Sequence, residues 1–283
     1  KRTKIMKKKF LNLGKQPITN SFLKDVDKKT INKEYFYNLS VGFNKKNYLV
    51  SLMKHVDPKK QFTNQYAHRA SQSKTMRESF KETAKKLKKN FKPNNCLEIG
   101  SNDGVFIKNF KKKQIIAVEP CTNLAKITQS QGYKTYGEFW NKKIALKIKK
   151  KHGRFDLIFS ANTISHIPNL DEVFKSVSIE LKENGVFVFE DPYIGSVIQN
   201  NSYDQFYDEH VHLFSLISIS KIISKAHLKV FDVEITKNHG GSIRFYVCRK
   251  NSYFIETKRL KLLKSKEIKQ GLNKMKTYQK FST

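Results

Sequence analysis

The feature that most constrains this chain is a short apolar strand that turns at once toward a helix, with the sequence LEIGSNDG at residues 97–104. Gly100 and Gly104 permit the backbone angles of a tight strand-to-helix turn, and they leave room for a ligand near the backbone. A second apolar run, 115–118, ends in Glu119, where a carboxylate can accept hydrogen bonds from ribose hydroxyls. This spacing is typical of a βαβ unit, and it predicts a pocket for a nucleoside cofactor.

The residues of the turn distinguish between two classes of cofactor. Dinucleotides place a pyrophosphate at a helix N-terminus and usually require three glycines. Here Asn102 stands at the middle glycine position and Asp103 follows it, so a pyrophosphate would meet a carboxylate. S-adenosylmethionine (SAM) carries sulfonium and ammonium groups, which acidic and amide groups suit better, so the turn favours SAM over NAD. The alternative of a turn without any ligand is weakened by Glu119. We expect the cofactor to be bound by Glu98, Gly100, Asn102, Gly104, Glu119, Pro120, Phe139 and Asn162.

Strands and helices alternate along the middle of the chain, which predicts an α/β fold with a doubly wound, Rossmann-like parallel sheet. The expected strands are 96–99, 115–118, 134–136, 155–160 and 185–190. The expected helices are 74–91, near 105–110, 123–131, 141–150, 170–181 and 216–226. The runs 228–235 and 242–249 are expected to close the sheet as an antiparallel pair.

We divide the chain into three parts. Residues 1–72 are expected to form a small irregular N-terminal domain, and residues 73–250 the SAM-binding domain. Residues 251–283 are expected to form a lysine-rich helix that begins a missing or truncated domain. Its apolar stripe is expected to pack on another domain or subunit. The stripe consists of Leu260, Leu263, Ile268 and Leu272.

The formal net charge of +32 raises the possibility of nucleic-acid binding. The lysines are scattered over helix faces and no nucleic-acid-binding motif accompanies them, so a generic basic surface that favours an anionic substrate is the preferred interpretation. The three cysteines are widely spaced, which indicates reduced core thiols. No apolar run approaches the roughly 18 residues of a membrane span, and no signal peptide is visible. We therefore expect a cytoplasmic protein without a membrane partner, of undetermined oligomeric state.

Two polar clusters could carry chemistry. Asn162 and His166 follow the strand 155–160, at the edge of the sheet where ligands of α/β proteins lie. The run 203–212 is dense in titratable groups, and a carboxylate beside a histidine suits a general base. The alternatives for this run are a salt-linked surface loop or, with less support, a metal site at His210 and His212. Candidate substrate-binding residues are Tyr193, His239 and Arg244.

Several motifs together resemble the SAM-dependent C-methyltransferases of deoxysugar pathways, which methylate C3 of nucleotide-linked 4-keto sugars. The motifs are LNLGKQPITNSF, LEIGSNDG, ANTISHIPNL, VFEDPY, SYDQFYDEHVHLFS and HGGSIR, and they extend over about residues 10–249. The resemblance implies a base that removes the proton next to a ketone, after which the enolate carbon attacks the sulfonium methyl group. It implies that His210 is this base, with Glu209 and Tyr207 beside it. It also implies that residues 73–250 form a SAM-dependent methyltransferase domain with the class I SAM methyltransferase sheet. In addition, it implies a second active-site histidine, His166, and a lid over the cofactor that contains Tyr66.

The chain departs from this family in two respects. The family holds zinc through paired cysteines in its N-terminal domain, whereas residues 42–47 carry asparagines where one pair belongs, so we expect no zinc and no other metal. The family also continues into a C-terminal domain that helps to hold the nucleotide sugar, and we expect this chain to lack it. Two alternatives therefore stay open, namely O- or N-methylation of another small anionic metabolite and a non-catalytic, nucleic-acid-binding relative.

Overall fold

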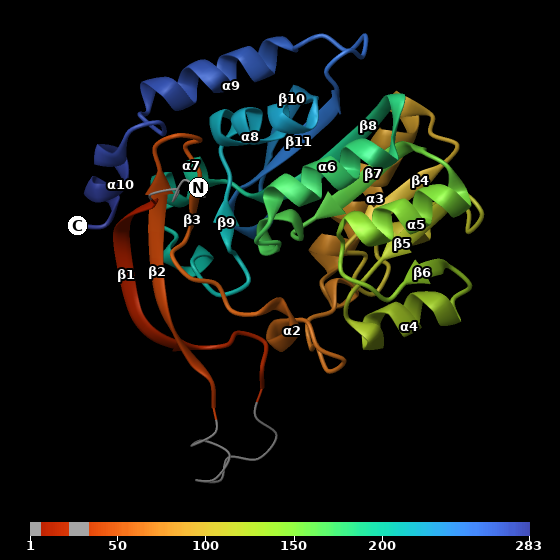
Figure 1. The fold of residues 1–283 in the computed structure, drawn as a ribbon, viewed down its shortest axis with the longest axis horizontal. Helices are drawn as coiled ribbons and strands as arrows, with labels where there is room; N and C mark the ends of the chain where they lie inside the picture. Colours follow the sequence, from red (N-terminus) through yellow and green to blue (C-terminus); the bar gives the residue numbers. More distant parts are fainter. Residues whose placement is uncertain (1–6, 23–33) are drawn as a thin grey trace.

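The computed structural model describes residues 7–22 and 34–283, and its centre is a seven-stranded sheet (Figure 1). The strand order is β10-β11-β8-β7-β4-β5-β6. The strands are β4 (Cys96–Ile99), β5 (Ile115–Val118), β6 (Lys134–Tyr136), β7 (Phe155–Ala161), β8 (Leu181–Pro192), β10 (Leu228–Thr236) and β11 (Ser242–Arg249). The first five are parallel, whereas β11 runs antiparallel to both of its neighbours. This confirms the Rossmann-like class I SAM methyltransferase fold, with the last strand inserted between its two predecessors.

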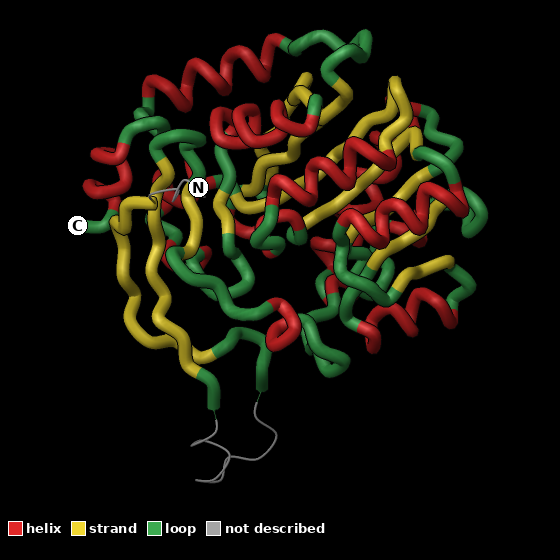
Figure 2. Tube along the Cα trace, viewed as in Figure 1, coloured by secondary structure: helices red, strands yellow, loops and turns green. Residues whose placement is uncertain are grey.

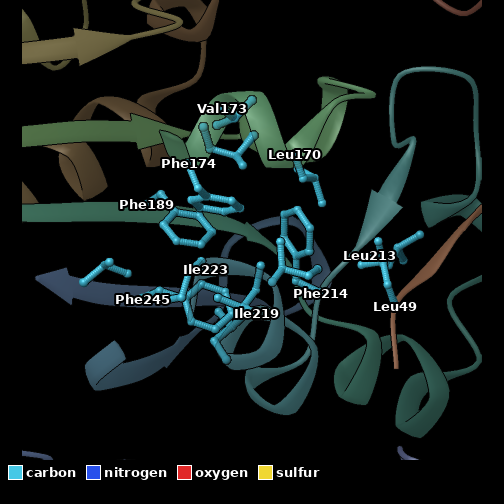
Figure 3. Close-up of a cluster of buried hydrophobic side chains, with 14 of the residues drawn as sticks. Leu49, Leu170, Val173, Phe174, Phe189, Leu213, Phe214, Ile219, Ile223 and Phe245 are labelled. Atoms are coloured by element: carbon cyan, nitrogen blue, oxygen red, sulfur yellow. The ribbon is translucent and has the colours of Figure 1, made fainter. Parts of the chain in front are cut away.

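Helices cover both faces of this sheet. The helices are α3 (Lys74–Phe91), α4 (Thr122–Ser130), α5 (Lys142–His152), α6 (Leu170–Glu180), α7 (Ile194–Asn200) and α8 (Leu216–Ile223). Successive residues of β8 point to opposite faces, as the pleat requires. Phe187 and Phe189 pack with α5, α6 and α8 in one core cluster, whereas Val186 and Val188 pack with α3 in another. Figure 3 shows Phe189 next to Phe174 of α6, with Phe245 on its other side and Ile219 and Ile223 of α8 nearby.

A second, four-stranded sheet has the order β1-β2-β3-β9. It consists of β1 (Lys7–Pro17), β2 (Phe36–Asn44), β3 (Val50–Leu52) and β9 (His212–Leu213). The strand β9 belongs to the segment that the sequence placed in the methyltransferase domain, and it pairs antiparallel with β3. Leu49 and Leu213 join the same core cluster as Phe214 (Figure 3). The N-terminal sheet and the central sheet therefore share one continuous hydrophobic core.

The C-terminal helices pack against this structure. They are α9 (Lys258–Lys269) and α10 (Met275–Phe281), and Gly271 at φ +73° lies between them. In the tube view, α9 runs beside α8 and α10 lies beside β1 (Figure 2). Leu260 and Leu272 are buried in the main core cluster, although Ile268 is 48% exposed. The expected apolar stripe thus covers this chain's own core, which corrects the prediction that it packs on another domain or subunit.

Two further local predictions differ from the structure. The segment expected to be helical near residues 105–110 contains only a short 3-10 turn, Ile107–Asn109. Strand β1 was not predicted, because its lysine-rich sequence lacks the alternation of a half-buried strand. It lies at the edge of its sheet, where lysines are common because they discourage pairing with other chains.

All three cysteines, Cys96, Cys121 and Cys248, are buried and free, as expected. No helix in the described part of the chain is both long enough and apolar enough to cross a membrane.

Candidate active site

A cavity of about 610 Å³ lies at the carboxyl ends of β4, β5 and β7. Carboxyl ends of parallel strands are where α/β sheets bind ligands. Most residues that the sequence singled out line it. These are Tyr66, Glu98, Gly100, Asn102, Glu119, Pro120, Phe139, Asn162, His166, Tyr207, Glu209, His210 and His239. The structure therefore brings the expected cofactor loop and the expected base into one cavity.

Two buried carboxylates, Glu98 and Glu119, lie in the cofactor part of this cavity. Glu119 Oε2 accepts a hydrogen bond from the Asn102 backbone N–H at 2.7 Å, and Oε1 accepts one from the Cys121 N–H at 2.9 Å. Burial raises the pKa of Glu119, and burial with the nearby charge of Glu119 holds the pKa of Glu98 well above its usual range. Glu98 Oε2 has no partner among the described residues, so it is available to a cationic ligand group.

The glycines of the turn are required by the protein's own packing. Gly100 has φ +75°, and a Cβ there would lie 2.1 Å from Thr163 Oγ1. Gly104 has φ +88°, and a Cβ there would lie 2.8 Å from Thr128 Cγ2. Gly104 does not line the cavity. Glycine is thus needed at both positions, because φ is positive and because a Cβ would collide with a threonine side chain. Only Gly100 also lines the cavity.

Asn102 and Asp103 hold another segment of the chain against the turn. Asn102 Oδ1 accepts a hydrogen bond from the Ala70 N–H at 2.9 Å. Asp103 accepts hydrogen bonds from the Ser71 N–H at 3.2 Å and from the Ser71 hydroxyl. Asp103 is buried and does not line the cavity, so its carboxylate anchors residues 66–73 and does not face a ligand.

The end of β7 places two polar side chains in the cavity. Asn162 has φ +49°, its Nδ2 donates to His239 Nε2 at 3.0 Å, and its Oδ1 is buried without a partner in the described structure. The His166 ring stacks on Phe62, with centroids 5.7 Å apart. Burial holds the pKa of His166 well below its usual range, so this imidazole is neutral near pH 7.

His210 is held as a neutral imidazole with a defined proton position. Its Nδ1 lies 2.9 Å from the Gln205 carbonyl oxygen, which can only accept, so Nδ1 carries the proton. Its Nε2 is therefore unprotonated, and it lies 3.0 Å from the Tyr207 hydroxyl, which donates to it. Burial lowers the pKa of His210 to about 4, although the Gln205 carbonyl opposes this shift. Burial raises the pKa of Tyr207, so its hydroxyl stays protonated.

The two carboxylates before His210 are anchored to the N-terminal part of the chain. Glu209 Oε1 accepts from Asn20 Nδ2 at 2.9 Å, and Oε2 accepts from the Tyr66 hydroxyl at 2.9 Å. Burial raises the pKa of Glu209 to about 7, while these two donors oppose the shift. Asp208 is fully buried and accepts from Gln61 Nε2 at 2.7 Å. Residues 208–212 are therefore buried, although Asp204 at the start of the run is exposed, and this burial argues against the alternative of a salt-linked surface loop.

Several buried polar atoms that line the cavity have no hydrogen-bond partner among the described residues. They are Glu98 Oε2, Ser101 Oγ, Trp140 Nε1, Asn162 Oδ1 and His166 Nε2. Buried polar atoms are nearly always paired in folded proteins. A polar ligand with donors, acceptors and a positive charge would pair these atoms, and SAM has all three. The donor set of the cavity therefore fits this cofactor.

Two expected substrate-binding residues lie outside the cavity. Tyr193 belongs to the main hydrophobic core, where its ring packs against Gly195. Arg244 is buried and binds Glu190 at 2.6 Å and Glu234 at 3.3 Å, so its charge is used inside the protein. Only His239 of the three expected substrate-binding residues lines the cavity.

The cavity residues that were not predicted from the sequence include Trp140 and Asn20. Trp140, the single tryptophan of the chain, follows Phe139 and has a buried indole nitrogen. Asn20 lies within the motif LNLGKQPITNSF, so the signal was present, but its link to Glu209 depends on the fold.

The family model described as a methyltransferase domain matches residues 66–233, which is more than half of the chain. The chain belongs to the methyltransferase family. As a member of this family it is a SAM-dependent enzyme, and SAM is its cofactor.

The flanking parts of this methyltransferase match two further family models. Residues 237–283 match a model described as a C-methyltransferase C-terminal domain, so our expectation that the chain lacks this domain is wrong. Residues 4–62 match a model described as a putative zinc binding domain, although this range contains no cysteine. Within residues 7–22 and 34–283, no group of three or more His, Cys, Asp or Glu side chains is placed to hold a metal ion.

One curated relative is the C-methyltransferase NovU of Streptomyces niveus, which is 32% identical over 149 residues. The match covers 52% of this chain and 36% of NovU, so the chain spans about a third of that protein's length. Solved structures that are similar to this chain include a SAM-dependent methyltransferase from Clostridium acetobutylicum. It has 17% sequence identity and a TM-score of 0.47, and the match covers 61% of this chain and 91% of that one. Another is magnesium protoporphyrin IX methyltransferase from Synechocystis, with 11% sequence identity and a TM-score of 0.45. This match covers 61% of this chain and 83% of that one.

Proposed function

We propose that this methyltransferase transfers a methyl group from SAM to a carbon atom of a nucleotide-linked keto-deoxysugar, after a base has removed the proton next to the ketone. The observation that carries this proposal is the neutral imidazole of His210, whose unprotonated Nε2 shares a cavity with the expected cofactor turn. Further support comes from the sequence resemblance and from the C-methyltransferase NovU. When bound, SAM supplies an electrophilic methyl group on its sulfonium.

The residues that we expect to hold the cofactor are those of the turn and the two buried carboxylates. Glu119 has lone pairs on both oxygens beyond those used by backbone N–H groups, and these can accept from ribose hydroxyls. Glu98 offers Oε2 to the ammonium group, which would favour its ionised form.

The residues around His210 suit proton removal from a carbon acid. The substrate displaces the Tyr207 hydroxyl from Nε2, and Nε2 then accepts the α proton while Nδ1 keeps its bond to Gln205. The Gln205 carbonyl and the carboxylate of Asp204 both raise the pKa of His210 against the effect of burial, and so favour the imidazolium that forms. His166, which is neutral and has Nε2 unpartnered in the described structure, can donate to the developing enolate oxygen. The electron pair of this enolate then forms the bond from the α carbon to the methyl group, which would leave the sulfonium sulfur of SAM.

The test compares His210→Asn with the wild-type chain, using radiolabelled SAM and a set of nucleoside diphosphate-linked 4-keto-deoxysugars. We expect methyl transfer to fall by about 100- to 10,000-fold, because general bases contribute this much, while the Kd for SAM is unchanged. The matched control is His212→Asn, since His212 is equally buried but bonds to the Pro168 carbonyl and does not line the cavity.

Proton exchange separates carbon methylation from the alternative of O- or N-methylation. In D₂O, wild-type enzyme should exchange the α hydrogen of the substrate without methyl transfer, and His210→Asn should not. Methyl transfer without any α exchange would favour O- or N-methylation. Full activity of His210→Asn would refute the assignment of His210 as the base.

A further inference from the structure

The C-terminal helix α10 contacts the loop that carries His210. Phe281 stacks on Tyr203 with ring centroids 4.6 Å apart and planes at 10°, and it lies 6.0 Å from the Phe206 ring. The Tyr203 hydroxyl also donates a hydrogen bond to the Phe281 carbonyl oxygen. Phe206 and Phe281 are both buried. These contacts join the matched C-methyltransferase C-terminal segment, residues 237–283, to the segment just before the proposed base.

The other face of α10 is fixed to the N-terminal sheet. The Tyr278 ring lies 4.6 Å from Phe43 and 5.3 Å from Phe10, and Tyr278 is fully buried. Its hydroxyl donates to the Leu272 carbonyl at 2.7 Å, which closes the turn before the helix. Helix α10 is therefore seated on β1 and β2 and presents Phe281 to the loop from a fixed support.

A short path connects Phe281 to the proton position of His210. Tyr203 and Phe206 flank Gln205, whose carbonyl oxygen accepts from His210 Nδ1. The Phe206 N–H donates to the Tyr203 carbonyl at 3.1 Å, so these residues move as one turn. A shift of this turn would move the acceptor that keeps Nδ1 protonated and Nε2 basic.

We propose that Phe281 is a positioning residue for His210: by stacking on Tyr203 and packing against the tilted Phe206 ring it fixes the Gln205 carbonyl, and so the imidazole tautomer, for the reaction. The inference rests on the proposed function for its catalytic consequence, but its structural part can be measured without substrate. Phe281 itself does not line the cavity, so it acts through the loop and not by contact with a ligand.

The experiment uses the full chain with ¹⁵N-labelled histidine and compares Phe281→Ala, Phe281→Tyr and Phe10→Ala. Phe281→Tyr keeps the stacked ring. Phe10→Ala is the matched control, because it removes an aromatic contact of α10 on the side away from the loop. Imidazole ¹H–¹⁵N spectra report the tautomer of His210, whose signals are identified by their loss in His210→Asn. SAM affinity, melting temperature and kcat are measured on the same samples.

We expect Phe281→Ala to lose the single Nδ1–H tautomer of His210 and to lower kcat by about 10- to 100-fold, with the Kd for SAM unchanged. Phe281→Tyr should retain the tautomer and most of kcat, and so should Phe10→Ala, even if it melts earlier. The proposal is overturned if Phe281→Ala keeps the wild-type tautomer, or if Phe10→Ala and Phe281→Ala disturb it equally. If no substrate of the set is methylated by the wild type, the proposed function fails, and the tautomer measurement still decides the positioning role.

Discussion

Replacing Arg244 by Met should destabilise the fold strongly while leaving SAM binding intact. Arg244 is 7% exposed, and its guanidinium bonds to Glu190, Glu234 and Thr83, which ties β11 to β8, β10 and α3. Met fills a similar volume but leaves the Glu190 carboxylate, itself 4% exposed, without its cation. Removing one partner of a buried ion pair costs about 3–5 kcal/mol in unfolding free energy.

Urea unfolding followed by circular dichroism measures this loss, and calorimetry measures SAM affinity. At roughly 2 °C per kcal/mol for a chain of this size, the melting temperature should fall by about 6–10 °C. The double variant Arg244→Met with Glu190→Gln should recover part of the stability, because no uncompensated charge stays buried. If Arg244→Met has wild-type stability and changes only the KM for substrate, which rises, this reasoning is refuted. That result would support an anion-binding role for Arg244.

Two further predictions concern buried carboxylates. Because burial raises the pKa of Glu98, SAM binding should release protons, and the affinity for SAM should increase as the pH rises. Calorimetry in buffers of different ionisation enthalpy measures this proton release, which Glu98→Gln should abolish. Proton release that persists in Glu98→Gln would point to another group. Glu267 accepts from the backbone N–H groups of Leu216 and Ile217, and burial raises its pKa from 4.5 to about 7. The folded state holds this proton more tightly, so the stability it contributes is present below pH 4.5 and is lost, by about 3 kcal/mol, as the pH rises through 7. Urea unfolding near pH 5 and near pH 8 should show a smaller pH dependence for Glu267→Gln than for the wild type, and equal slopes would exclude Glu267 as the source.

The parts of the fold that were predicted correctly depend on local patterns. The parallel strands are short apolar runs bounded by turns, and the turn at Gly100 with Glu119 after the next strand is a signal within one βαβ unit. The antiparallel pair β10 and β11 was also visible, because both runs are apolar and a glycine turn separates them.

The parts that were missed depend on contacts between distant residues. The two-residue strand β9 exists because β3 pairs with it, and no pattern of two residues can indicate that. The same is true of Asp103, which the sequence placed toward the cofactor's charges, although the structure uses it to anchor Ser71. Arg244 could equally have bound a ligand, and only the positions of Glu190 and Glu234 show that it is already paired.

The contact between α10 and the loop of His210 also has a consequence for the order of events during synthesis. The strands of the central sheet and every residue that lines the cavity leave the ribosome before residues 275–281. Domains generally fold from the N-terminus as they emerge. A nascent chain can therefore complete its cofactor pocket while the Tyr203 and Phe206 rings still lack their partner on Phe281. The contact of Phe281 with the loop of the proposed base can therefore form only after all residues of the cavity have been synthesised.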